Sequence, residues 1–195
     1  GSKTLLVPST LEINGKRNVI TNSATVMRDG TVFYTVSSTY FRLNDGLYEL
    51  SSSGTGRLME YDPKTNSSEV RMYDLPFTNG VLMSPNDQFV LVAVSAQSKI
   101  WKYHLYGSRQ GQFEVFYEAP GMPDNIKSNG RGGYLVGIPS VFHPGRKVHV
   151  AKFFRTKPVL SRFICQTLRL VQVALDGFNR YVFPVDAFKM IIDKA

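Results

Sequence analysis

Only one of the 195 residues is a cysteine, and this scarcity excludes several kinds of site. Cys165 has no partner for an internal disulfide, and the chain cannot build a cysteine-based metal cluster or redox pair. We expect this lone thiol, within Phe163-Ile164-Cys165, to be a small buried apolar residue rather than a nucleophile.

Long hydrophobic runs are also missing. No stretch of about 18 or more apolar residues occurs, so we expect no helix that spans a membrane. The first residues lack the basic and apolar regions of a signal peptide, so no targeting segment is expected within this chain.

Charged residues are few, at 19%, whereas 43% of the residues are hydrophobic, which favours a packed core over disorder. The net charge of +8 is concentrated between residues 147 and 169. No nucleic-acid-binding motif accompanies it, so nucleic acid is not expected as a partner. An anionic membrane surface or an anionic protein fits this basic segment better.

One pattern occurs three times: an Asn, a short strand, a Gly/Asp/Asn turn and a second apolar strand. Its Asn residues are at positions 22, 79 and 125, which are 57 and 46 residues apart. A period of about 40–50 residues with several strands is typical of β-propeller blades. Because equivalent residues of successive blades meet near the axis, we expect Asn22, Asn79, Asp124 and Asn125 to converge.

Short apolar or alternating runs separated by turns predict an antiparallel all-β fold. At about 40–50 residues per blade, the chain has room for about four blades. We therefore expect residues 1–195 to form a single β-propeller domain that is incomplete at both ends. The expected strands are Val32–Val36, Arg57–Tyr61, Glu69–Tyr73, Phe89–Val94, Lys99–Leu105, Glu114–Tyr117 and Tyr134–Ile138.

Residues 146–169 break this rhythm, because apolar residues recur there at helical spacing with basic residues between them. We expect Pro158 to split this insertion into two short helices, and Leu168–Leu175 to return to strand. The insertion either caps one face of the propeller or lies on a bilayer interface. The apolar residues expected to make either contact are Phe153, Phe154, Phe163 and Ile164.

Several motifs together resemble the strictosidine synthase-like family, and within it the adipocyte plasma membrane-associated proteins. The motifs are Gly56-Arg-Leu-Met-Glu-Tyr-Asp-Pro63, Phe77-Thr-Asn-Gly-Val-Leu-Met-Ser-Pro85, Phe89-Val-Leu-Val-Ala93, Ile100-Trp101 and Pro120-Gly-Met-Pro-Asp-Asn-Ile126. The resemblance implies a six-bladed β-propeller related to paraoxonases and gluconolactonases. It also implies a secretory-pathway or membrane-associated location, in the endoplasmic reticulum or plasma membrane.

The resemblance further implies that Asn22, Asn79, Asp124 and Asn125 are ligands of a divalent cation, usually calcium, in the central channel. A complete propeller would then be a hydrolase of arylesterase type, with a small ester or lactone as substrate. The residues themselves leave an alternative open, since Asn often caps turns and bonds the backbone where a strand begins.

Three departures from the family pattern limit this inference. The first-blade Glu ligand would precede residue 1, and the catalytic acid of the true synthases would follow residue 195, so a true strictosidine synthase is not expected. Two acids expected beside the channel are replaced by Val36 and Val94. These losses favour the alternative of a catalytically inactive, membrane-associated binding or scaffold propeller.

Three other positions carry a hypothesis. His143 and His149 enter the basic segment and are candidates for a general base above a metal-activated water. His104 is expected to be a surface or half-buried strand residue. Asn66-Ser67-Ser68 is an N-glycosylation sequon in an expected exposed turn, as in a glycoprotein.

Overall fold

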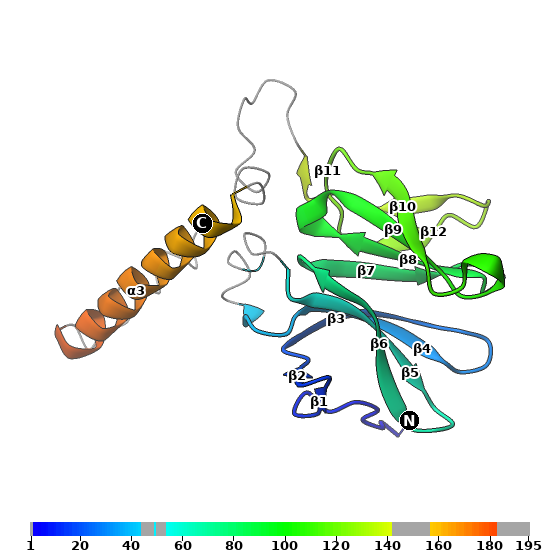
Figure 1. The fold of residues 1–195 in the computed structure, drawn as a ribbon, viewed down its shortest axis with the longest axis horizontal. Coiled ribbons are helices and arrows are strands. Elements are labelled where there is room, and N and C mark those ends of the chain that lie inside the picture. Colours follow the sequence, from blue (N-terminus) through cyan, green and yellow to red (C-terminus); the bar gives the residue numbers. More distant parts are fainter. Residues whose placement is uncertain (1, 44–48, 50–53, 142–156, 183–195) are drawn as a thin grey trace.

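The computed structural model describes residues 2–43, 49, 54–141 and 157–182 (Figure 1). These residues form several antiparallel sheets and one long helix, which confirms the all-β propeller expectation. The first large sheet has four strands in chain order. They are β3 (Ile20–Val26), β4 (Val32–Ser38), β5 (Gly56–Asp62) and β6 (Ser67–Leu75).

The second large sheet repeats the arrangement of the first, again with four strands in chain order. They are β7 (Thr78–Met83), β8 (Phe89–Val94), β9 (Lys99–His104) and β10 (Phe113–Glu118). The seven strands expected between residues 32 and 138 all overlap strands of the structure. The hydrophobic alternation and the turn residues were therefore sufficient to locate them.

Smaller elements complete the described part of the chain. Three two-stranded sheets pair β1 (Glu12–Ile13) with β2 (Lys16–Arg17), β11 (Gly121–Met122) with β14 (Ser140–Val141), and β12 (Ile126–Ser128) with β13 (Tyr134–Val136). Two 3-10 turns, η2 (Ser95–Gln97) and η3 (Gly107–Arg109), flank β9.

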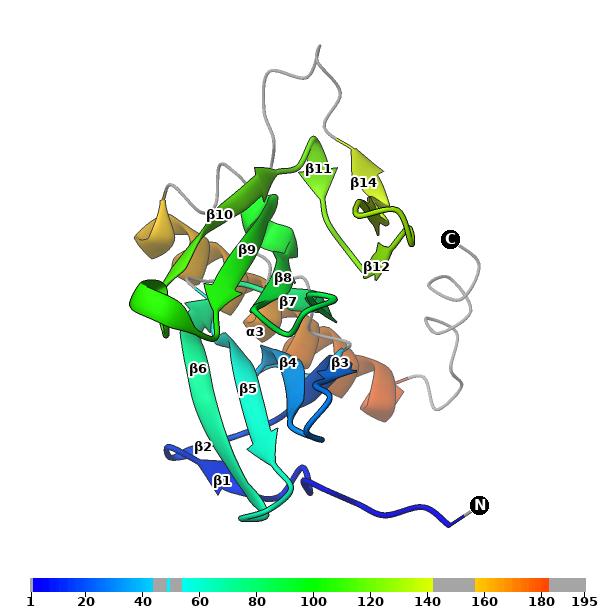
Figure 2. The same ribbon diagram turned by 90° about the vertical axis from the view of Figure 1, so that its right-hand side faces the viewer.

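The sheets are arranged as propeller blades. Strand β3 lies beside β7, and β7 lies beside β12, so the three repeats begin on neighbouring strands (Figure 2). The described residues complete two blades and begin a third with β12 and β13. Residues 158–182, which were counted towards the expected four blades, form a helix and add no strand.

The two blades share one hydrophobic core. Its cluster combines Phe33, Leu58 and Met72 of the first blade with Val90 and Val92 of the second, and each is at most 1% exposed. Burying such side chains contributes about 1.5–3 kcal/mol each. The core therefore holds the blades, and with them the starts of β3 and β7, in a fixed relation.

Helix α3 (Pro158–Val182) corrects the expectation for the C-terminal segment. Pro158 begins the helix and does not split it, because at the first helical position the missing N–H would have no intrahelical partner. Leu168–Leu175, expected as a strand, lies inside the helix. Of the expected insertion, residues 146–156 lie outside the described part of the chain.

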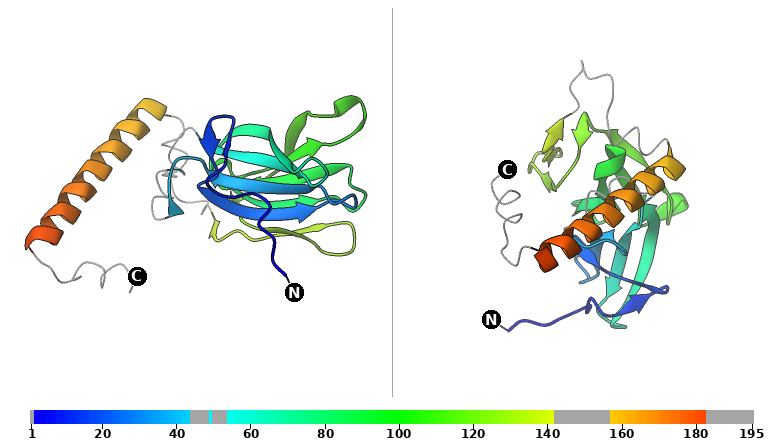
Figure 3. Two further views of the ribbon diagram at one scale, coloured as in Figure 1. Left: turned by 90° about the horizontal axis from the view of Figure 1, so that it is seen from below. Right: turned by 90° about the vertical axis from the view of Figure 1, so that its left-hand side faces the viewer.

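Helix α3 lies apart from the blades in this structure, beyond one end of their strands (Figure 3). The expected cap contact is not made by Phe163, whose side chain is 64% exposed, and Ile164 is only half-buried. Phe153 and Phe154 lie outside the described residues, and so does the side chain of Cys165.

Candidate functional site

The proposed ligand residues lie where the three repeats begin. Asn22 is in β3, Asn79 is in β7, and Asp124 and Asn125 directly precede β12. Because β3, β7 and β12 are neighbours, the fold brings these positions to adjacent inner strands. The repeat pattern thus predicted that these positions lie on or beside neighbouring strands, and a cation site formed by them stays a prediction.

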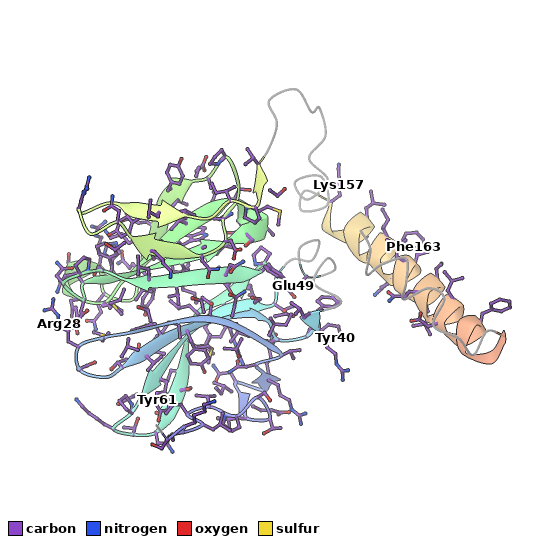
Figure 4. All side chains as sticks on the ribbon, turned by 180° about the vertical axis from the view of Figure 1, so that it is seen from behind. Arg28, Tyr40, Glu49, Tyr61, Lys157 and Phe163 are labelled. Carbon is purple, nitrogen blue, oxygen red and sulfur yellow. The ribbon has the colours of Figure 1, made fainter. Side chains whose placement is uncertain are left out.

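The site lies at the end of the blades that faces α3. Ile20 of β3 pairs with Ser38, so the start of β3 lies at the end of β4. Figure 4 shows Tyr40, which follows β4 closely, at the end facing α3, and Arg28 at the opposite end. Asn22 therefore lies on the α3 side of the first blade.

Asn22 is connected to the second blade through a serine. Its amide Nδ2 donates to Ser37 Oγ at 3.0 Å, and Ser37 Oγ donates to the carbonyl oxygen of Thr78 at 2.6 Å. Ser37 is fully buried, and Thr78 is the residue just before Asn79. This relay ties the start of β3 to the start of β7.

The second repeat contains the same relay. The amide Nδ2 of Asn79 donates to Ser95 Oγ at 3.4 Å, and Ser95 Oγ donates to the carbonyl oxygen of Pro123 at 2.6 Å. Pro123 is the residue just before Asp124. The two relays thus connect all three repeats, each through a serine at or just after the end of a second blade strand.

The relays also fix which way the two amides face. A serine hydroxyl has one proton, and in both relays that proton goes to a backbone carbonyl. Each serine must therefore accept from its Asn, which directs Nδ2 to the serine and leaves Oδ1 on the other side of the amide. Among the described residues neither Oδ1 has a hydrogen-bond donor, so both remain available as oxygen ligands.

The third repeat is held by backbone contacts. The N–H of Gly80 donates to Asp124 O at 3.1 Å, and the N–H of Asp124 donates to Gly137 O at 2.8 Å. A Cβ at position 80 would lie 2.7 Å from the Cα of Asn125, so only glycine permits this approach. Asp124 is half-buried and Asn125 is exposed, and Asn125 Nδ2 lies 3.4 Å from Asp124 Oδ1.

The side chains of the four candidate residues supply the kind of oxygen ligand that a hard cation binds. Calcium takes carboxylate and amide oxygens, and the set contains three amides and one carboxylate. Asp124 supplies the only formal charge, and within the described ranges no three His, Cys, Asp or Glu side chains gather as a metal cluster. The chemistry fits calcium, but the set needs further oxygens to reach the usual six to eight ligands.

Val36 and Val94 are not beside this site, which corrects one expectation. Both side chains are fully buried in hydrophobic clusters, Val36 with Tyr34 and Met59, and Val94 in the core between the blades. Successive strand residues face opposite ways, so the neighbouring Ser37 faces the relay while Val36 faces the core. An apolar residue at these positions therefore says little about catalysis.

The remaining candidate residues fall elsewhere. His104 lies on β9, 3.0 Å from Glu114 of β10 at the outer edge of the second blade, which confirms the strand position. It is buried, however, and not at the surface or half-buried as expected. Asn66 is exposed in the turn between β5 and β6, as expected for a sequon, although its modification stays a prediction. His143 and His149 lie outside the described residues.

Sequence reasoning missed the serine relays and a buried arginine. The positions of Ser37 and Ser95 carried a signal, because each serine directly follows a valine at or just after the end of the second strand of a repeat. Arg57 lines a cavity of about 180 Å³. Its two terminal guanidinium nitrogens donate to the carbonyl oxygens of Ile13 and Lys16 and to Asn18 Oδ1, each at 2.8 Å. Burial lowers the pKa of Arg57, and its role is to hold the β1–β2 hairpin.

The family assignment follows from this sequence and fold together. Residues 22–108, which span the first blade and most of the second, match the sequence profile described as strictosidine synthase. The chain carries a strictosidine synthase family domain. The match begins at Asn22, where the first repeat begins.

Named relatives support the same family. The Drosophila melanogaster adipocyte plasma membrane-associated protein Hemomucin is 34% identical over 189 residues, covering 93% of this chain and 32% of the relative. The Gallus gallus adipocyte plasma membrane-associated protein is 37% identical over 172 residues (86% and 41%), and Arabidopsis thaliana strictosidine synthase-like 13 is 32% identical over 145 residues (74% and 36%). The matched part of the chain thus spans between 32% and 41% of these relatives.

Solved structures show the same fold. A gluconolactonase from Xanthomonas campestris matches with a TM-score of 0.51 at 18% identity, over 65% of this chain and 44% of that one. A luciferin-regenerating enzyme matches with a TM-score of 0.50 at 17% identity, over 68% and 42%. At these identities the likeness concerns the fold and not the reaction.

Proposed function

We propose that Asn22, Asn79, Asp124 and Asn125 hold a divalent cation, calcium by their donor chemistry, and that the complete protein is a hydrolase of aryl-ester or lactone type. The observation that carries this proposal is the repeated relay, in which no described residue donates a hydrogen bond to the Oδ1 atom of Asn22 or Asn79. An Asn that merely capped a strand would need no such fixed amide orientation.

Each residue has a distinct part in this proposal. Asn22 and Asn79 supply neutral oxygens whose direction is set by Ser37 and Ser95, and Asp124 supplies negative charge. A bound calcium ion would polarise the carbonyl oxygen of the substrate and stabilise the negative charge that develops there. His143 and His149 remain the candidates for the base that takes a proton from water.

The hydrolase proposal is tested on the complete natural protein. Hydrolysis of phenyl acetate and of a lactone should be measured with and without chelator, in the parent and in Asn79→Leu. We expect turnover that chelator abolishes and that falls at least about a hundredfold in the variant, because the variant removes one oxygen ligand. Absent turnover, or turnover that chelator leaves unchanged, would contradict the proposal.

A second candidate function is a membrane-associated binding or scaffold propeller without catalysis. Two observations favour it: the single formal charge among the four candidate ligands, and relatives that are named plasma membrane-associated. In the part of the chain that the structure describes, no helix is long and apolar enough to cross a bilayer. Membrane binding without any esterase or lactonase turnover would favour this candidate.

A further inference from the structure

Helix α3 exposes apolar side chains along its length. Within Pro158–Val182, nine apolar side chains are each between 41% and 82% exposed. They are Val159, Leu160, Phe163, Leu168, Leu170, Val171, Val173, Leu175 and Phe178. Contiguous exposed apolar surface of this kind usually marks an interaction site.

The cationic positions of α3 lie on one side of the helix, largely opposite the exposed apolar positions, and Val173, four residues after Arg169, is the exception. Arg162, Arg169 and Arg180 are 7 and 11 residues apart, about two and three helical turns, so they share one side of the backbone. Phe178 is nine residues from Arg169, about two and a half turns, and lies on the opposite side. The helix is therefore strongly amphipathic, with an apolar face and a basic face.

Charge decides which partner fits this helix. Residues 158–182 contain three Arg and a single acid, Asp176, and Lys157 directly precedes them. A second copy packed through the apolar faces would leave both basic faces outward without an anionic partner, so it would complement only one face of the helix. A lipid interface that presents anionic headgroups above an apolar interior complements both faces at once.

We propose that α3 lies in the plane of an anionic membrane surface, with its apolar face in the acyl boundary and its basic face at the headgroups. At about 1.5 Å per residue, the 25 residues would cover about 37 Å of that surface. The same helix lies beyond the blade ends where Asn22 is placed, so the bound membrane would lie on the candidate site's side. The inference rests on the proposed membrane association and is independent of the hydrolase proposal.

The test uses the complete chain in vesicle flotation, with phosphatidylcholine vesicles and with vesicles containing about 30% phosphatidylserine. The diagnostic variant is Leu170→Ser/Leu175→Ser, whose leucines are 71% and 56% exposed on α3. The matched control is Leu5→Ser/Leu135→Ser, which removes two leucines that are 77% and 63% exposed outside the helix. Both variants lose the same chemical groups.

We expect the parent to float with the anionic vesicles, and the α3 variant to lose at least about tenfold in partition coefficient. The control variant should stay within about twofold of the parent, and Arg169→Gln/Arg180→Gln should lose about tenfold on anionic vesicles only. Ester and lactone hydrolysis, measured on the same samples, reports the hydrolase proposal separately.

Three results would overturn the inference. Equal flotation of the two leucine variants would place the membrane contact elsewhere in the chain. A parent that floats with neither vesicle, but whose α3 variant melts several degrees lower, would show that the apolar face packs against the protein itself. A parent that does not float but is dimeric, with a monomeric α3 variant, would assign the face to a second copy.

Discussion

The two blades and helix α3 differ in the solvent exposure of their apolar residues. In the blades, residues such as Leu58, Val90 and Val92 are fully buried between two sheets that supply each other's cover. In α3, residues of the same kind, such as Leu170 and Phe178, are more than half exposed. A sheet pair completes its own core, whereas an amphipathic helix of this kind requires a surface from another source.

The comparison also separates two uses of polar residues. In the blades, buried polar groups such as Ser37 and Thr78 bond to one another across strands and fix the site. In α3, Asp176 is exposed to solvent. The polar contacts of the candidate site therefore belong to the blades, whereas surface recognition is the role that we propose for the helix.

The largest expected difference in stability is between two leucine truncations, one in the blade core and one on α3. Leu58→Ala in the blade core should lower the free energy of unfolding by about 2–5 kcal/mol, because it removes contacts and leaves a cavity. Leu170→Ala on α3 should change it by less than about 0.5 kcal/mol in the absence of lipid. Urea unfolding of both variants measures the difference, and comparable losses would contradict the distinction between the regions.

A smaller effect is expected from removing one relay hydroxyl. Ser37→Ala leaves the carbonyl oxygen of Thr78 buried without its donor, which should cost about 1–3 kcal/mol in stability. Ser67→Ala, at an exposed serine of β6, is the control and should cost less than about 0.5 kcal/mol. If the two alanine variants unfold alike, the relay does not hold the blades together.

The smallest expected effect on stability comes from a hydrogen-bonded pair at the outer edge of the second blade, His104 and Glu114. The His104 ring, which hydrogen-bonds the carboxylate, holds the pKa of Glu114 below its ordinary value of 4.5, and Arg109 adds to the effect. Because the folded-state pKa is the lower one, this pair stabilises the fold above about pH 4.5 and the contribution is lost as pH falls through the folded pKa.

An NMR titration of the Glu114 carboxyl carbon measures that shift. In His104→Ala we expect the pKa of Glu114 to rise towards 4.5, since the first cause of its lowering is gone. A carboxyl pKa that is the same in parent and variant would show that His104 does not set it.

The sequence was sufficient for the strands of the two blades and for placing the candidate ligands where successive repeats begin. The alternation within Phe89–Val94 and the turn residues around it needed no long-range information, and the spacing of Asn22, Asn79 and Asn125 identified equivalent positions of successive blades. Both features depend on residues close together in the sequence or on their spacing, so the sequence pattern is enough to predict them.

Other features depend on contacts that a sequence pattern does not contain. Pro158 was read as a helix breaker, although a proline at the first helical position is well tolerated. Val36 and Val94 were read as lost channel acids, although the strand alternation turns them into the core. The relay through Ser95 to Pro123 O joins residues 28 positions apart, and only the folded arrangement reveals it.

The central claim is that oxygens of successive inner strands hold one calcium ion, and thermal unfolding of the complete natural protein with and without calcium tests it most directly. A ligand at about 100 times its Kd adds about 2.7 kcal/mol to stability. We predict that calcium raises the Tm of the parent and of Asp176→Ala, an exposed-acid control on α3, by several degrees, and leaves the Tm of Asp124→Ala unchanged. An equal rise in all three proteins, or none in the parent, would contradict the account.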